Sequence, residues 1–225
     1  MRSLFTVCAG IGAAGVMMFA SGCGSNGNAE LRVVQASPDT GEVNVVLNSK
    51  TISTDIGYAG NTGYISVDSG SPNLQIIPVN SSTPIVNETP NLASSSENTV
   101  IVANYAANVT GIVLVDNNTD PPSGEAQLRI VNAAPGISAA DVYFVPSGSS
   151  LTTIAPIITS LGFETASSYE TLTAGTYQVF MTVPGTKNAY FSTGQLTLTS
   201  GQIRTLVALN STTGGYTSVT LSDLN

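Results

Sequence analysis

Histidine, the commonest general base, is absent from this sequence, and a pair of carboxylates is the acid–base arrangement that remains to be weighed. Glycoside hydrolysis needs only two carboxyl groups on opposite sides of a bond, so it is the enzymatic chemistry that the fourteen Asp and Glu residues leave open. Glu164 and Glu170 flank the start of an expected strand and form the candidate pair. The carboxylates are scattered and Trp is absent, so we favour solvated loop carboxylates and expect no enzyme.

The residue composition also restricts nucleophilic catalysis and metal binding. The two cysteines, Cys8 and Cys23, lie in or beside the apolar N-terminal segment, so we expect no thiol and no disulfide in the remaining chain. Without histidine or a thiol, Ser-His-Asp and Cys-His arrangements and Cys/His zinc sites are excluded. Ser49 and Lys50 are adjacent in an expected turn, which is a weak basis for a Ser-Lys pair. We therefore expect no catalytic residues, no metal ligands and no cofactor.

Residues 116–120 place oxygen-bearing side chains at alternate positions, as a calcium-binding loop does. Pro121 stands where such a loop needs glycine, and Gln127 replaces the bidentate glutamate, which excludes an EF-hand. An improvised calcium site at this joint is an alternative. We prefer a solvated linker whose Asp and Asn side chains cap turns.

Arg32 and Arg129 recur on two expected strands, each with apolar neighbours. They could anchor an anionic ligand. We instead expect each arginine to lie outward over its sheet and to pair with a nearby polar group, for which Asn44 and Asp141 are the candidates.

Tyr64 and Tyr169 also occupy equivalent positions, each before a strand and a glycine turn. Tyrosines at the corners of β-sandwiches commonly hydrogen-bond the backbone through the hydroxyl. We expect that role for both, rather than a ligand platform.

These pairs recur because the chain is a tandem repeat: residues 29–38 return as residues 126–135, at an offset of 97. The offset becomes 105 at Tyr64 and Tyr169, which indicates about eight inserted residues around 147–158. A period near 100 residues is too long for a solenoid unit, so the sequence predicts two domains.

Both repeats show the composition of β-structure, and no window holds apolar residues at helical spacing. Residues 100–103 and 112–115 are apolar on both faces, which predicts strands central in a sheet. We expect an all-β fold of two tandem antiparallel β-sandwich domains of immunoglobulin or transthyretin-like size. Strands of the first repeat are expected over residues 31–36, 43–47, 63–67, 73–79, 99–105 and 111–116.

The N-terminus predicts export, because Arg2 precedes an uncharged apolar segment and residues 1–22 read as a signal peptide. Ala20-Ser21-Gly22 before Cys23 resembles the lipobox of bacterial lipoproteins, although the family usually has Leu where Ala20 stands. The resemblance implies cleavage between Gly22 and Cys23, lipidation of Cys23 with palmitate-type chains, and a membrane anchor. Gly24 follows, where lipoproteins kept at the inner membrane often carry Asp, so an outer membrane is favoured if the organism has one.

The remaining chain divides by composition. We expect a flexible tether over residues 23–28, domain 1 over 29–117, a proline-bearing linker over 118–124 and domain 2 over 125–225. Without the signal peptide, five basic residues stand against fourteen acidic ones, a net charge of −9, which excludes nucleic acid as a partner. We expect the membrane, through the lipid, and an envelope protein or glycan as partners.

Residues 31–38 and Val43-Asn44-Val45, followed by Tyr64 and Gly70, resemble the DUF4397 family of bacterial envelope proteins. The second copy matches more fully through Ala140-Asp141-Val142-Tyr143 and Ala174-Gly175-Thr176-Tyr177. Gln35 and Asn132 stand where the family commonly has His. The family has no established activity, so the resemblance implies fold and location but no catalytic residues.

Together these features predict a non-enzymatic, envelope-anchored lipoprotein with a structural, adhesive or ligand- or protein-binding role. The alternative is a carboxylate-dependent envelope hydrolase, or an accessory module that binds a polymer for such an enzyme.

Overall fold

The computed structural model describes residues 27–224, whose regular secondary structure is almost entirely β-strand. The predicted signal peptide and the predicted lipidation site at Cys23 lie outside the described residues. Within the described part, no helix has the length and apolar character needed to cross a membrane. The all-β sandwich prediction is confirmed.

The first half of the chain forms two four-stranded sheets, which we call the N-terminal sandwich. Their orders are β4-β1-β7-β8 and β3-β2-β5-β6, and a short 3-10 helix, η1 (Ala106–Asn108), precedes β8. The strands are β1 (Asn28–Gln35), β2 (Val43–Leu47), β3 (Lys50–Ile56), β4 (Ile65–Asp68), β5 (Leu74–Pro78), β6 (Val86–Glu88), β7 (Glu97–Ala103) and β8 (Thr110–Asp116).

The second half repeats this arrangement as the C-terminal sandwich, with sheets β11-β10-β14-β15 and β12-β9-β16-β17, and with β13 also paired to β9. Its elements are β9 (Glu125–Asn132), β10 (Ala139–Pro146), η2 (Leu151–Thr153), β11 (Ile158–Gly162), β12 (Thr165–Ala166), β13 (Glu170–Thr173), β14 (Gly175–Thr182), β15 (Ala189–Leu198), β16 (Ile203–Asn210) and β17 (Tyr216–Leu224).

One pair of strands in each sandwich is parallel. β1 pairs with β7 and β9 pairs with β16 in parallel, and the other ladders are antiparallel. In both pairs the arginine stands opposite a threonine, as Arg32 with Thr99 and Arg129 with Thr205. The parallel pairing therefore brings two polar residues together on one face of each sheet.

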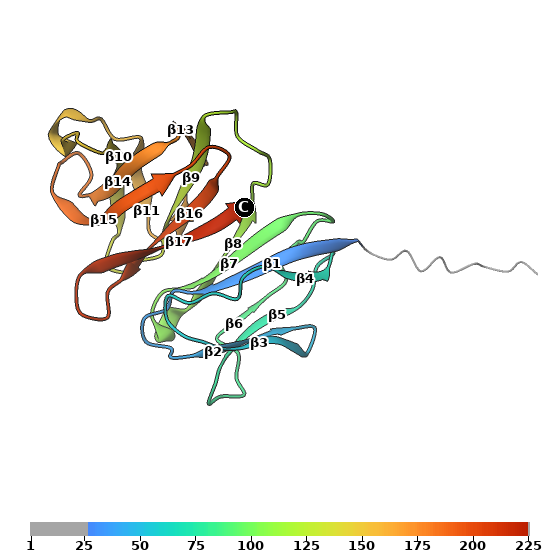
Figure 1. Ribbon diagram of the computed structural model, residues 1–225. Helices are drawn as coiled ribbons and strands as arrows, with labels where there is room; N and C mark the ends of the chain where they lie inside the picture. Colours follow the sequence, from blue (N-terminus) through green and yellow to red (C-terminus); the bar gives the residue numbers. More distant parts are fainter. Residues whose placement is uncertain (1–26, 225) are drawn as a thin grey trace, which may run out of the picture.

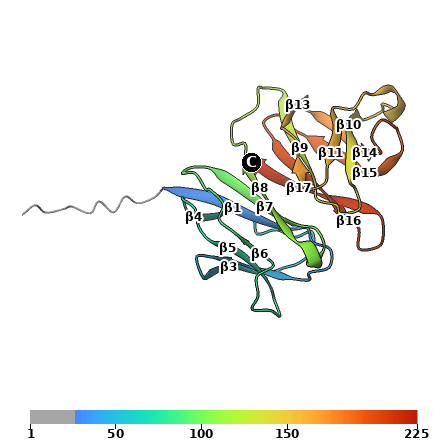
Figure 2. The same ribbon diagram turned by 180° about the vertical axis from the view of Figure 1, so that it is seen from behind.

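The two sandwiches pack against each other through the sheets that contain β1 and β9 (Figures 1 and 2). A third hydrophobic cluster fills this contact, and its buried members come from both sandwiches: Val34, Ala36, Ile101, Ala103, Val131, Ala133, Val207, Leu209 and Leu221. Both inner sheets are thus covered on two faces.

This packing explains the apolar runs. In β7, Val100 and Val102 face the core of the N-terminal sandwich, whereas Ile101 and Ala103 face the C-terminal sandwich. The prediction that residues 100–103 form a central strand is confirmed. The same prediction for residues 112–115 is wrong, because β8 is an edge strand and Val115 is 66% exposed. Its apolar character serves the contact between sandwiches, where Ile112 and Leu114 pack.

The connections differ between the halves. β2 and β3 are joined by Asn48 and Ser49 alone, both at positive φ (48° and 67°), as a tight two-residue hairpin requires. The corresponding connection between β10 and β11 is longer and includes η2, which agrees with the insertion inferred around residues 147–158. Lys187 holds it by donating to the carbonyl of Ile154, with its ammonium 3.9 Å from the centre of the Tyr143 ring.

Candidate functional site

The polar residues singled out by the repeat converge between the two sandwiches. We call them the ionic cluster, and its members are Arg32, Tyr64, Thr99, Asp116, Arg129, Tyr169, Thr205 and Asp223. The arginines and threonines alternate along their strands with residues that face each sandwich's own core. They therefore occupy the same contact face as the interdomain apolar cluster.

The ion pairs cross between the sandwiches. Nη2 of Arg32 lies 2.5 Å from Oδ1 of Asp223, and Nη2 of Arg129 bonds Oδ1 of Asp116. Each arginine also lies near the second aspartate, at 3.6 Å for Arg32 and Asp116 and at 3.9 Å for Arg129 and Asp223. Two positive and two negative charges are thereby balanced within one buried group.

The tyrosine of each sandwich supports both partners. The guanidinium carbon of Arg32 lies 4.4 Å from the centre of the Tyr64 ring, and that of Arg129 lies 4.6 Å from the Tyr169 ring. The Tyr64 hydroxyl donates to Asp116 at 2.7 Å, and the Tyr169 hydroxyl donates to Asp223 at 2.8 Å. Cation–π contact and charge-assisted hydrogen bonding are combined in one side chain.

The threonines complete the network. Nε of Arg32 donates to the Thr99 hydroxyl at 3.0 Å, and that hydroxyl donates to Asp116 at 2.5 Å. Thr205 performs the same two functions for Arg129 and Asp223. Each carboxylate therefore accepts from a tyrosine and a threonine of its own sandwich and from an arginine of the other. This is the reciprocity of an isologous dimer interface, here within one chain.

Burial sets the electrostatics of the cluster. Both arginines are 3% exposed, and the carboxylate side chains of Asp116 and Asp223 are fully buried. Burial raises the pKa of the Tyr64 and Tyr169 hydroxyls, and the nearby aspartates raise it further, so both remain donors. Burial also raises the pKa of the Glu97 carboxyl, with Asp116 as the largest charged contributor. The buried charges are tolerated because each is paired and hydrogen-bonded.

The predicted role of the arginines is wrong. The arginines are buried rather than outward, and they pair with Asp116 and Asp223 rather than with Asn44 or Asp141. Asn44 accepts from the amide of Asp55, and Asp141 accepts from the amides of Ser160 and Gly185. The predictions treated each sandwich alone, whereas the partners belong to the other repeat.

Both tyrosine hydroxyls donate to carboxylates, and the Tyr169 hydroxyl also accepts from the backbone amide of Asn117 at 3.4 Å. The predicted backbone role is therefore wrong for Tyr64 and holds only in part for Tyr169. The corner-tyrosine prediction was based on single sandwiches, in which the aspartates of this cluster would be exposed. Within the pair of sandwiches the hydroxyl instead satisfies an acceptor that burial has deprived of water.

The other candidate residues are separated. Glu164 accepts from Asn104 and Thr110 across the sandwich contact, and Glu170 accepts from Ser168 at the start of β13. The Asp116 carboxylate binds Arg129, Tyr64 and Thr99 in the ionic cluster. It is therefore not available as a ligand for the calcium site considered at residues 116–120. Within residues 27–224, no group of three or more Asp, Glu, His or Cys side chains could hold a metal.

Sequence reasoning overlooked Thr99, Thr205 and Asp223 as site residues. The signal was present, because Thr99 with Asp116 recurs as Thr205 with Asp223, at equivalent positions of the two repeats. A duplicated polar residue on a strand that is apolar on both faces indicates a buried polar contact at a second interface.

A family model described as a domain of unknown function, DUF4397, matches residues 29–143. This is more than half of the chain. The chain belongs to the DUF4397 family. The DUF4397 match covers Arg32, Tyr64, Thr99, Asp116 and Arg129, and it ends before Tyr169, Thr205 and Asp223.

Comparison with solved structures gives distant similarity to two larger proteins. The Bacillus anthracis TIE protein has 12% identity and a TM-score of 0.27, over 82% of this chain and 34% of its own. A leucine-rich repeat protein from Bacteroides thetaiotaomicron has 10% identity and a TM-score of 0.22, over 79% of this chain and 25% of its own. The DUF4397 chain thus spans about a third and a quarter of these proteins. No curated protein matches it.

Proposed function

We propose that this protein is a non-enzymatic lipoprotein of the bacterial envelope, in which two DUF4397 sandwiches form one rigid body that serves as a structural or binding module. The observation that carries the proposal is the ionic cluster. Its four charges, two tyrosines and two threonines are turned toward one another between the sandwiches. The side chains best suited to chemistry are therefore committed to joining the repeats.

Rigidity follows from the kind of contact. An ordinary interface between domains of one chain is polar and permits relative motion. Here an apolar cluster and two crossed, buried ion pairs occupy the same face. Separating the sandwiches would expose the apolar side chains and four charges together. A module of this kind holds the loops at its ends at fixed distances, which suits a scaffold or an adhesive surface.

Anchoring is supported by the start of the fold. β1 begins at Asn28, and the amide of Ser69 donates to the carbonyl of Gly27 at 2.8 Å. Only residues 24–26 then separate the lipobox cysteine, Cys23, from the folded body. Two or three acyl chains on Cys23 would hold the sandwiches close to a bilayer, because each buried methylene contributes about 0.8 kcal/mol.

The test of anchoring is intact-mass analysis of the protein isolated from bacterial membranes, with Cys23→Ala as the matched variant. We expect a mature chain that begins at Cys23 and carries a diacylglyceryl group, found in the membrane fraction. Cys23→Ala should remain uncleaved at this site and lack the lipid mass. A wild-type chain without added lipid mass would contradict the proposal.

The non-enzymatic part is tested on purified protein with envelope polysaccharides and peptidoglycan as substrates. We expect no turnover above that of a Glu164→Gln, Glu170→Gln variant, because these carboxylates make separate structural contacts. Saturable hydrolysis that one of these changes abolishes would favour the hydrolase alternative.

A further inference from the structure

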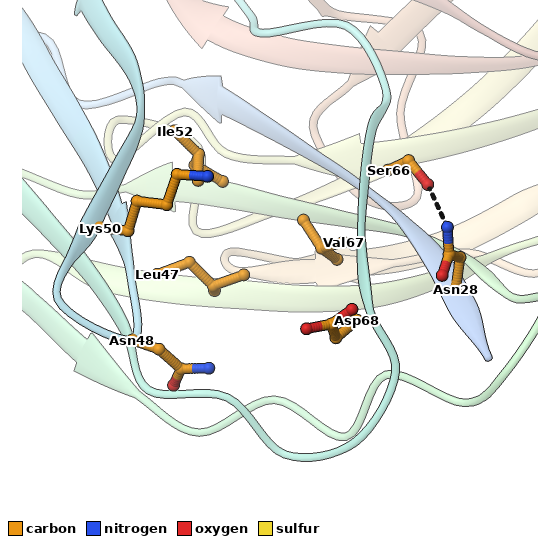
Figure 3. A pocket seen from close by; sticks show the side chains of 8 residues that line it. All are labelled: Asn28, Leu47, Asn48, Lys50, Ile52, Ser66, Val67 and Asp68. Carbon is orange, nitrogen blue, oxygen red and sulfur yellow. Dashed lines mark hydrogen bonds between the residues drawn. The ribbon is translucent and has the colours of Figure 1, made fainter. Parts of the chain in front are cut away.

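A groove of about 360 Å³ opens at the end of the N-terminal sandwich where the chain enters the fold (Figure 3). It lies between the β2–β3 hairpin and β4, the exposed edges of the two sheets. Its lining residues are Asn28, Leu47, Asn48, Lys50, Ile52, Ser66, Val67 and Asp68.

The floor of the groove is apolar and its walls carry two opposite charges. Leu47 and Val67 are buried at the floor, each 8% exposed. Lys50 and Asp68 stand on opposite sides in Figure 3, and neither side chain has a hydrogen-bond or ion-pair partner within residues 27–224. Two unpaired, opposite charges across an apolar floor are complementary to a molecule that carries both signs.

The two asparagine side chains that line the groove, Asn28 and Asn48, already make hydrogen bonds within the protein. The Asn28 amide donates to the Ser66 hydroxyl at 3.1 Å, and Asn48 accepts from the backbone amide of Asn73 at 2.9 Å. These bonds hold the rim of the groove in place. Lys50 and Asp68 are therefore the groups available for a ligand.

The groove also lies beside the proposed anchor, and this step rests on the proposed function. Asn28 pairs with Asp68 in the β1–β4 ladder, one residue after Gly27. The Cα atoms of Cys23 and Gly27 can be at most about 14 Å apart, because an extended chain spans at most ~3.6 Å per residue. A lipid on Cys23 would bring the groove to the headgroup layer of the bilayer.

We propose that this groove binds the phosphoethanolamine headgroup of a membrane phospholipid. The Lys50 ammonium pairs with the phosphate, and Asp68 accepts hydrogen bonds from the ethanolamine ammonium. The apolar floor contacts the glycerol and the first methylenes. A docked headgroup would orient the two sandwiches on the membrane, beyond the tethering that the lipid supplies.

Charge favours a zwitterionic headgroup over an anionic one. The mature chain has a net charge of −9, so an anionic surface repels it and one lysine does not compensate. Choline headgroups carry the same charges but have no N–H to donate to Asp68. The geometry therefore predicts a preference for ethanolamine over choline.

The second repeat lacks these groups. Register in the β9–β13 ladder places Glu125 and Thr173 where Asn28 and Asp68 stand, and Ser147 corresponds to Lys50. The longer β10–β11 connection also replaces the tight hairpin. The charge pair is a property of the sandwich nearest the anchor.

The experiment uses the mature lipidated protein in vesicles of phosphatidylethanolamine or phosphatidylcholine, with amide hydrogen exchange as the readout. We expect slower exchange in residues 47–52 and 65–68 with phosphatidylethanolamine only. Lys50→Met and Asp68→Asn should each abolish this protection. Glu42→Gln removes one charge at the other end of β2 and should leave it intact.

A second measurement tests headgroup binding without the lipid anchor, so that failure of one proposal can be told from failure of the other. Dihexanoyl-phosphatidylethanolamine is titrated into the full mature chain with Cys23→Ser, and backbone NMR shifts are followed. Asp68→Asn should weaken binding by about tenfold, the loss of one charge-assisted hydrogen bond. Equal protection in both vesicle types, or no shift near Lys50 and Asp68, would overturn the headgroup site. Failure of the wild type to remain with any vesicle, while the titration succeeds, would instead overturn the anchor.

Discussion

The guanidinium of Arg32 and the carboxylate of Asp223 lie 2.5 Å apart although 191 residues separate them in the chain. Arg129 and Asp116 form the equivalent pair in the reverse direction. The first arginine of the fold is therefore neutralised by one of its last described residues, and a second ion pair joins the two repeats near the point where one follows the other in the sequence.

Removal of one member of this pair should be strongly destabilising. Arg32→Met leaves the Asp223 carboxylate buried without its arginine, at a cost of about 3–5 kcal/mol in unfolding free energy. In a double-mutant cycle with Asp223→Asn, urea unfolding should give a coupling energy of about 1–3 kcal/mol. Arg204→Met is the matched control, since Arg204 forms no ion pair within residues 27–224. Additive effects of Arg32→Met and Asp223→Asn would show that the pair is not coupled.

The sandwiches should unfold together. The apolar cluster and the ionic cluster are buried only while the two sandwiches are in contact, so unfolding of one sandwich exposes part of the other. Calorimetry of the mature chain should show one transition whose calorimetric and van't Hoff enthalpies agree. Ile101→Ala removes contacts only on the shared face and should cost about 2–5 kcal/mol. Two independent wild-type transitions, with Ile101→Ala affecting only one, would refute this coupling.

The tyrosine hydroxyls of the cluster should contribute separately from their rings. Tyr169→Phe keeps the ring beneath Arg129 but removes the hydrogen bond to Asp223, together with the longer one from the Asn117 amide, at an expected cost of about 1.5–3 kcal/mol. Tyr177→Phe also removes a hydroxyl bond, but to an exposed backbone carbonyl, and should cost less than about 1 kcal/mol. Chemical denaturation compares the two variants. Equal losses would mean that the buried carboxylate adds nothing to the bond.

Stability should fall at alkaline pH. Burial raises the pKa of Tyr58 to about 12 from its ordinary 10.0, and it raises those of Tyr64 and Tyr169 as well. The folded state then binds more protons than the unfolded state above pH 10, so this stabilisation is complete below pH 10 and is lost as pH rises through about 12.

Urea unfolding at a series of pH values tests this dependence, and tyrosinate absorbance follows the ionisation. Tyr58→Phe should flatten the slope between pH 10 and 12, since burial raises the pKa of the Tyr58 hydroxyl to about 12 and this titration is lost in the variant. A slope unchanged by Tyr58→Phe would show that this hydroxyl titrates normally.

Several features could be predicted from the sequence because they depend on neighbours along the chain. Alternation in residues 43–47 predicts a half-buried strand, and β2 has that burial pattern. The duplicated segments predict a repeated fold, and the sheets of the two halves follow the same order. The position of β8 could not be predicted in this way. Its apolar residues suggested a central strand, but β8 is an edge strand whose apolar face is covered by the other sandwich.

The sequence by itself determined the all-β fold, the repeat and the absence of histidine, because composition and period are local properties of the chain. Only the tertiary structure decided what Arg32, Arg129, Tyr64 and Tyr169 do. The ion-pair partners of the two arginines lie in the opposite repeat, and each tyrosine binds an aspartate that this pairing buries. The cost of burying a charge exists only once two sheets have excluded water between them. The sequence of one repeat does not show that contact, so polar residues that are predicted to lie on the surface of a single sandwich are instead buried between the two sandwiches.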